Sequence, residues 1–306
     1  MKKIYLPIGF LLLFFAGCKQ EAAKDDGVFK IVATTGMLGD VAEAIVGEYA
    51  EVESLMGPGV DPHLYKATQG DLKLLKEADL IIYNGLHLEG KMGEVLEKLA
   101  NFPNKKVIAA AEVIDEGKLI MADEKNEILD PHVWFDVALW SETVDPIKRA
   151  VIAFDPAHEQ TYGENAAGKV AELTSLDTWV RERLAEIPND QRKLITAHDA
   201  FAYFGRAYNI EVTGLQGIST LSEAGIKDVT QLVDEIVNEK IKAVFVESSV
   251  PRKSLEAVVE GARNQDHEVV IGGTLYSDAM GEKNTPEGNY KGMVEHNITT
   301  IVEALK

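Results

Sequence analysis

The sequence predicts an α/β protein with two lobes, each a mainly parallel four-stranded sheet flanked by helices, joined by one long rigid helix. Strand-like and helix-like apolar patterns alternate in each half of the chain, which is typical of parallel α/β sheets. A stretch without proline lies between the halves and has the apolar spacing of a helix. We therefore expect an N-terminal lobe at 29–155, a linking helix at 156–188 and a C-terminal lobe at 189–306.

The N-terminal half starts with an apolar run from Phe29 to Thr34 that is typical of a strand. Further strands are expected at 51–56, 80–83 and 106–110. Apolar residues at spacings of three and four predict helices around 41–46, 72–78 and 92–99. Strand and helix thus alternate through this half.

The C-terminal half repeats this order of elements without repeating the residues themselves. Strands are expected at 193–197, 211–214, 243–247 and 269–272. Helices are expected at 201–208, 229–237, 255–261 and 291–305. The repeated alternation favours a second parallel sheet.

The segment from Ala157 to Ile187 predicts the linking helix. Pro156 is placed to begin a helix and Pro188 to end it. A helix of about 30 residues would be about 45 Å long, enough to join two lobes as a stiff strut. The alternative is a break into two helices at Gly163 or Gly168.

Composition favours a folded chain that does not bind nucleic acid. The chain has 306 residues, of which 46% are apolar, enough for two domains of ordinary size. Its net charge is −19, whereas proteins that bind nucleic acid need a basic surface for the phosphates. We expect no nucleic-acid partner, and we expect a monomer.

The first residues predict a signal peptide and a lipid anchor. A basic start followed by a short apolar run is typical of a secretory signal, here assigned to 1–17. The run is too short to span a membrane, which takes about 20 residues. The segment Phe15 to Cys18 resembles a bacterial lipobox, although Phe15 replaces the usual aliphatic residue. The alternative is a soluble secreted protein that is cut nearby.

Acylation of Cys18 would anchor the chain outside the cytoplasm, in the periplasm or at the cell surface. The polar residues at 18–28 are expected to form a flexible tether. Cys18 is the only cysteine, so the chain has no internal disulfide and, once Cys18 is acylated, no thiolate ligand. A metal site would have to use His, Asp, Glu or backbone oxygens.

The tripeptide Asp-Pro-His occurs twice, and each copy follows an expected strand. Proline fixes one backbone dihedral and so helps to hold the neighbouring imidazole. In open parallel sheets, ligands gather beyond the carboxyl ends of the strands. Four side chains lie after strand ends in this way: His63, His132, His198 and Asp278. If the two sheet edges face each other, three imidazoles and one carboxylate converge, a set that suits a divalent transition metal.

Other polar residues are candidates for supporting roles. His158, His267 and His296 lie in polar or amphipathic segments, and we expect them to be solvated. His87 follows a strand and is expected to line the cleft or to support the ligands. Five carboxylates could orient imidazoles through the free ring nitrogen, or could simply cap helices and form turns: Asp61, Asp130, Asp136, Asp199 and Glu247.

Motifs for several other kinds of chemistry are absent from the sequence. The chain has no Walker-type phosphate loop, no GxGxxG after the first strand, no GxSxG and no HExxH. The cysteine count excludes cysteine catalysis.

Six segments together resemble the metal-receptor lipoproteins that serve ABC importers of manganese, zinc and iron, most of all the TroA-like branch. These segments are 61–63, 84–89, 130–136, 196–204, 246–249 and 277–281. The resemblance runs from about residue 30 to the C-terminus. It implies two α/β lobes on one long helix, a small closing motion, and a ligand set made of His63, His132, His198 and Asp278.

We therefore expect a receptor and not an enzyme. It would capture one divalent ion, Mn²⁺ or Zn²⁺ with Fe²⁺ also allowed, and hand it to a permease and its ATPase. The acidic segment 115–128 lacks histidine, unlike the corresponding loop of many zinc receptors, which disfavours a dedicated zinc scavenger. Protonation of the imidazoles should weaken binding below about pH 6.

Two other functions remain open from the sequence. One is a surface adhesin whose structure depends on metal. The other is a zinc hydrolase, which would keep three protein ligands and an open position for water.

Overall fold

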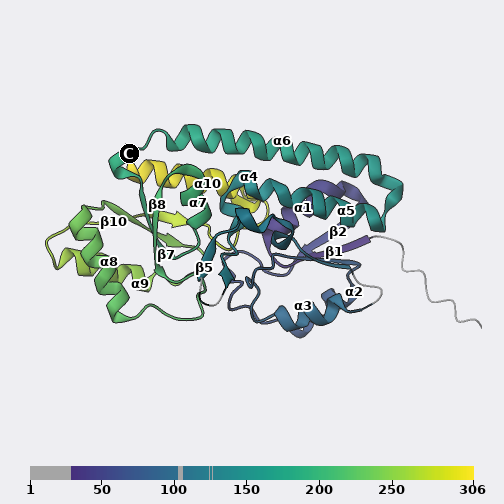
Figure 1. Ribbon diagram of the computed structural model, residues 1–306, viewed down its shortest axis with the longest axis horizontal. Helices are drawn as coiled ribbons and strands as arrows, with labels where there is room; N and C mark the ends of the chain where they lie inside the picture. Colours follow the sequence, from purple (N-terminus) through teal and green to yellow (C-terminus); the bar gives the residue numbers. More distant parts are fainter. Residues whose placement is uncertain (1–28, 103–105, 124, 126) are drawn as a thin grey trace, which may run out of the picture.

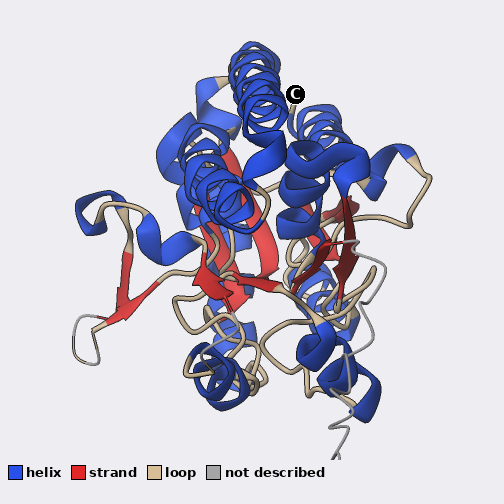
Figure 2. Cartoon of the chain, turned by 90° about the vertical axis from the view of Figure 1, so that its right-hand side faces the viewer, coloured by secondary structure: helices blue, strands red, loops and turns tan. Residues whose placement is uncertain are grey.

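The structure is a computed structural model that describes residues 29–102, 106–123, 125 and 127–306. The expected signal peptide, Cys18 and the tether up to residue 28 lie outside these residues. The two halves lie side by side, and one long helix, α6 (Glu159–Leu184), runs along both of them (Figure 1). The strands form a middle layer with helices above and below (Figure 2). None of the helices in the described part is long and apolar enough to cross a membrane.

The N-terminal half contains a four-stranded parallel sheet in the order β2-β1-β3-β4. Its strands are β1 (Phe29–Ala33), β2 (Ala50–Ser54), β3 (Leu80–Tyr83) and β4 (Lys106–Ala109). Its helices are α1 (Gly36–Val46), α2 (Gln69–Glu77) and α3 (Gly93–Ala100). The apolar run Leu80, Ile81 and Ile82 is fully buried, as expected for a strand covered on both faces. Because the strands are parallel, their carboxyl ends share one edge.

The C-terminal half contains four more strands that follow the same plan. They are β7 (Lys193–His198), β8 (Glu211–Gln216), β9 (Ala243–Glu247) and β10 (Val270–Leu275). The helices are α7 (Ala202–Tyr208), α8 (Ile226–Glu239), α9 (Lys253–Arg263) and α10 (Tyr290–Leu305). The strands hydrogen-bond as two parallel pairs, β7 with β8 and β9 with β10, while β7 lies beside β9. Where these two strands lie side by side, the Glu247 carboxylate accepts a hydrogen bond from the His198 backbone N–H.

The linking helix α6 is continuous through Gly163 and Gly168, so it is not broken into two. It begins three residues after Pro156, because that proline starts a 3-10 turn at 156–158, and it ends four residues before Pro188. One face of α6 is buried against helices from both halves, including α1 and α10. The helix therefore packs on both sheets' helical layers along its length.

The segment from 121 to 154 is more structured than the sequence pattern indicates. It contains an antiparallel hairpin, β5 (Met121–Asp123) and β6 (Ile128–Leu129), and two helices, α4 (Val137–Trp140) and α5 (Val144–Phe154). The helices α4 and α5 pack against α6, whereas the hairpin is largely exposed. Short 3-10 turns also occur at 47–49, 111–113, 116–118, 133–135, 141–143, 156–158, 189–191 and 286–288.

Buried apolar side chains form three clusters. The largest, here called the joint core, runs through both halves and includes Val41 of α1, Leu173 of α6 and Ile301 of α10. The N-terminal core includes Val32, Met56, Leu75 and Ile81. The C-terminal core includes Ile195, Val244, Leu255 and Val258. Among the described residues, the joint core is the one of these clusters that ties the two halves together by apolar packing.

Alanine at Gly163 or Gly168 should stabilise the protein. A Cβ at either position has no neighbour within 4 Å, and glycine costs about 1 kcal/mol relative to alanine inside a helix. We expect each substitution to raise the free energy of unfolding by about that amount, measured by urea denaturation.

Gly205→Ala in α7 is the matched control, because a Cβ there would lie 2.7 Å from the backbone oxygen of Ile210. This variant should lose stability. A loss of stability in the α6 variants would contradict an unbroken helix at those positions.

Candidate metal centre

Two of the expected ligands sit in loops built on the same tripeptide. His63 lies in the loop after β2, where Asp61 Oδ1 accepts a hydrogen bond from its backbone N–H at 2.8 Å. His132 follows β6, and Asp130 Oδ1 accepts from its backbone N–H at 2.9 Å. In both loops the aspartate closes a turn around the proline and so fixes the backbone that carries the imidazole.

The other two expected ligands come from the C-terminal half. His198 is the last residue of β7, and Glu247 is the last residue of the neighbouring β9. Glu247 accepts from the His198 backbone N–H at 2.9 Å and lies 2.5 Å from its Nδ1. Asp278 follows β10, and the carbonyl just before it, on Ser277, accepts a bond from Trp134 Nε1 at 3.0 Å.

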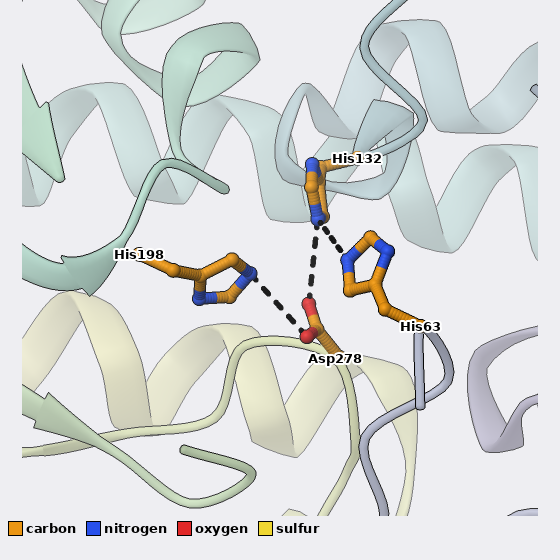
Figure 3. Close-up of side chains that lie close together, drawn as sticks. All are labelled: His63, His132, His198 and Asp278. Carbon is orange, nitrogen blue, oxygen red and sulfur yellow. Dashed lines mark hydrogen bonds and ion pairs between the residues drawn. The ribbon is translucent and has the colours of Figure 1, made fainter. Parts of the chain in front are cut away.

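The four side chains point toward one another (Figure 3). His63 Nε2 lies 3.3 Å from His132 Nε2. The Asp278 carboxylate lies 3.6 Å from His132 Nε2 through Oδ1 and 3.3 Å from His198 Nε2 through Oδ2. One ligand atom from each residue lies within 4.8 Å of the other three. The fold thus brings together all four residues that the sequence placed at strand ends.

The centre is buried, and three of its polar atoms have no hydrogen-bond partner. All four side chains belong to residues that are at most 3% exposed. His198 Nε2 and both oxygens of Asp278 are buried without a hydrogen bond. Buried polar atoms without partners cost free energy, so these lone pairs need something to bind. A divalent cation between the four side chains would satisfy them, and nitrogen with carboxylate oxygen suits a transition metal.

Carboxylates set the ring orientation of two imidazoles. Asp130 Oδ1 lies 2.7 Å from Nδ1 of His132, and Glu247 makes the equivalent contact with His198. A proton on Nδ1 bonds the carboxylate, which leaves the Nε2 lone pair facing the centre. Asp61 differs, because its second oxygen accepts from the Thr220 hydroxyl at 2.5 Å and not from an imidazole.

Burial and charge act in opposite directions on the site's pKa values. Burial lowers the pKa of His63 to about 3, against the attraction of Asp278. Burial also opposes charge on His198, but Glu247 and Asp278 outweigh it and raise that pKa well above the ordinary value. Burial opposes ionisation of Asp278, yet His198 and the other imidazoles hold its pKa below the usual range. Asp278 therefore stays ionised and attracts a cation, which competes with a proton for His198 Nε2.

The five supporting carboxylates divide by role. Asp130 and Glu247 contact imidazole nitrogens, as expected. Asp61 forms the turn of its own loop, and Asp136 caps α4. Asp199 bonds no imidazole, and burial raises its pKa.

The expectation that His87 lines the cleft or supports the ligands is wrong. His87 is exposed on a turn with φ of 66°. The buried carboxylate of this segment is Glu89, which accepts bonds from the Thr34 hydroxyl at 2.6 Å and the Asn84 backbone N–H at 2.7 Å. The Asn84 side chain donates to Pro131 O at 3.0 Å and so holds the second Asp-Pro-His loop. The sequence signal that could have identified Glu89 is a carboxylate in the loop directly after the apolar strand at 80–83.

The remaining histidines lie outside the cluster. His158, His267 and His296 are each half-buried, and each bonds a carboxylate or a backbone carbonyl. The expectation that they are solvated holds in part, because helix and loop packing covers only part of each ring.

A second acidic cluster already holds a lysine. Three glutamates approach one another near β7 and α8, namely Glu211, Glu235 and Glu239. Lys193 Nζ lies 2.9, 2.8 and 2.6 Å from their carboxylates, respectively. Because the lysine ammonium group already lies between these glutamates, they are a weaker candidate for a metal site than the buried centre.

Comparison with known proteins agrees with the resemblance seen in the sequence. Residues 31–304 match the family ZnuA, described as zinc-uptake complex component A, periplasmic. The manganese-binding lipoprotein MntA of Bacillus subtilis (strain 168) is 51% identical over 299 residues, 97% of each chain. The zinc-binding protein TroA of Treponema pallidum (strain Nichols) is 45% identical over 300 residues, 98% of this chain and 96% of TroA.

A solved structure supports the same relationship. The periplasmic zinc-binding protein TroA from Treponema pallidum matches with a TM-score of 0.88 at 46% identity, over 91% of this chain and 99% of that one. This match confirms the predicted α/β fold class. Because the sequence and structural similarities both extend over nearly the whole chain, this protein belongs to the ZnuA family of metal-binding receptors.

Proposed function

We propose that this protein is a lipid-anchored extracytoplasmic receptor that captures Mn²⁺ or Zn²⁺ and delivers the ion to an ABC importer. Three imidazoles and one carboxylate, all buried, offer ligand atoms within 4.8 Å of one another, and this geometry carries the proposal. The proposed ligands are His63, His132, His198 and Asp278. Relatives described as manganese-binding and zinc-binding support it.

Asp278 allows one site to accept more than one metal. Through a single carboxylate oxygen the site offers four ligands, the number that tetrahedral Zn²⁺ takes. Both oxygens face imidazoles, one near His132 and one near His198, so bidentate binding adds a second oxygen for the harder Mn²⁺. Fe²⁺ accepts the same mixture of nitrogen and oxygen.

We place the working protein outside the cytoplasm, anchored through an acylated Cys18 after removal of residues 1–17. Residues 18–28 would be the tether, and 29–155 and 189–306 the two lobes on either side of the linking helix at 156–188. The partners would be a permease and its ATPase, and the receptor would act as a monomer. The description of MntA as a lipoprotein supports the anchor.

We infer a receptor and not an enzyme. A zinc hydrolase keeps an open coordination position for water. Here Asp278 would take the fourth coordination position, and all four ligand residues are buried. Such a site favours holding an ion over activating water.

Alanine at His63, His132, His198 or Asp278 should each weaken Zn²⁺ and Mn²⁺ binding more than about a hundredfold. Loss of a residue that supports a ligand lowers metal affinity about 10- to 100-fold, and loss of the ligand itself lowers the affinity further. Affinity is measured by calorimetric titration, and bound metal by elemental analysis. His296→Ala, outside the cluster, is the control. Wild-type affinity in the four ligand variants would refute the site.

Glu247→Gln and Asp130→Asn should lower metal affinity about 10- to 100-fold, because each removes the charge that orients a ligand imidazole. Asp155→Asn is a matched control, since Asp155 contacts Nδ1 of a histidine outside the site, His158. The same titrations measure all three variants. Equal affinities in all three would show that the orienting carboxylates do not act on the ion.

Metal should stabilise the folded protein, and chelator should reverse the effect. An ion at about a thousand times its Kd adds about 4.1 kcal/mol to the free energy of unfolding. Thermal denaturation with Mn²⁺, with Zn²⁺ and with excess EDTA measures this change, and Asp278→Ala should abolish it. Competition between the two ions then ranks them. An unfolding temperature that neither metal changes would contradict the proposed function.

A further inference from the structure

The loop that carries His132 is fixed firmly to the C-terminal half. Tyr203 donates to the backbone oxygen of Asp130 at 2.9 Å, and Trp134 Nε1 donates to Ser277 O at 3.0 Å. Tyr290 donates to the backbone oxygen of Trp134 at 2.6 Å. The side chains of Trp134 and Tyr290 also belong to the joint core. Displacing His132 would therefore disrupt packing shared by both halves.

The loop that carries His63 is attached much more weakly. Its apolar residues Val60, Tyr65 and Ala67 pack against the N-terminal core and not the joint core. Leu64, next to the ligand, is 42% exposed. Among the described residues, one side-chain hydrogen bond joins segment 57–67 to the C-terminal half, and Thr220 donates it to Asp61.

Thr220 reaches this position from the loop between β8 and α8. Thr220 itself is buried, although the next residue, Leu221, is 57% exposed. Its hydroxyl donates to Asp61 Oδ2 at 2.5 Å, while Asp61 Oδ1 accepts from the His63 backbone N–H at 2.8 Å. A single carboxylate thus connects a residue of the C-terminal half to the backbone of a ligand in the N-terminal half.

The two sides of the centre differ in what an escaping ion would have to disrupt. On the side of α6, the joint core closes the gap between the halves. On the side of His63, the N-terminal and C-terminal cores are separate clusters. The side of His63 is thus the one that can open without breaking apolar packing between the halves.

We propose that Thr220 is a positioning residue that holds His63 in the site through Asp61, and that this bond controls how fast the ion leaves. The proposal rests on the proposed function, since it needs an ion bound by His63. When the bond breaks, the His63 loop moves away from the centre while the other three ligands stay in place. Loss of the Thr220 hydroxyl therefore accelerates release.

The test measures Zn²⁺ release from the full chain. Loaded protein is mixed in a stopped-flow instrument with an excess of a chelator whose fluorescence reports Zn²⁺. Thr220→Val removes the hydroxyl and keeps the shape of the side chain. We expect the variant to release Zn²⁺ about tenfold faster, which is the factor that corresponds to the loss of a hydrogen bond to a charged group. Thr220→Ser keeps a hydroxyl and should release Zn²⁺ near the wild-type rate.

Thr213→Val is the matched control, because the Thr213 hydroxyl also bonds a carboxylate, that of Glu235 at 3.0 Å, away from the ligands. It should release Zn²⁺ at the wild-type rate. Unfolding temperatures of metal-free Thr220→Val and Thr213→Val should be similar, because each variant loses one bond between a hydroxyl and a carboxylate, and this comparison separates positioning from general stability.

Three results would overturn the proposal. One is a wild-type release rate in Thr220→Val, another is equal acceleration in Thr213→Val, and the third is fast release in Thr220→Ser. Titration of the wild type with Zn²⁺ comes first and distinguishes the two levels of inference. Absence of one bound ion per chain would refute the proposed function itself, whereas stoichiometric binding with unchanged release in Thr220→Val refutes only the role of Thr220.

Discussion

A buried carboxylate among imidazoles needs positive charge close by, and the surrounding structure is organised around that need. Both oxygens of Asp278 are enclosed without a hydrogen bond, and the same is true of His198 Nε2. Enclosing such groups without partners opposes folding, while a divalent ion between them removes the cost. The affinity for the ion and the stability of the closed arrangement are therefore two aspects of one free energy.

Carboxylates outside the centre decide how firmly each ligand is held. Glu247 bonds both the backbone and the ring of His198, and Asp130 does the same for His132. For the ligand in the first Asp-Pro-His loop, Asp61 bonds the backbone alone. Two imidazoles are thus oriented before an ion arrives, whereas the ring of the third depends on its loop staying closed.

The placement of apolar packing gives this site one closed side and one side that can open. The joint core and α6 connect the halves along one side, and separating the halves there would expose buried side chains such as Leu173. On the opposite side each half has its own core. Packing of this kind favours a small movement of loops over wide hinge opening.

The sequence by itself determined the fold class and the four converging side chains. Alternating patterns predict parallel strands, whose carboxyl ends share an edge, so His63 and Asp278 could be placed without coordinates. Tertiary structure decided what depends on distant contacts: that Glu89 is buried while His87 is exposed, and that Thr220 meets Asp61 across 159 residues of chain. A local pattern carries periodicity, but it does not record which distant group a side chain will meet.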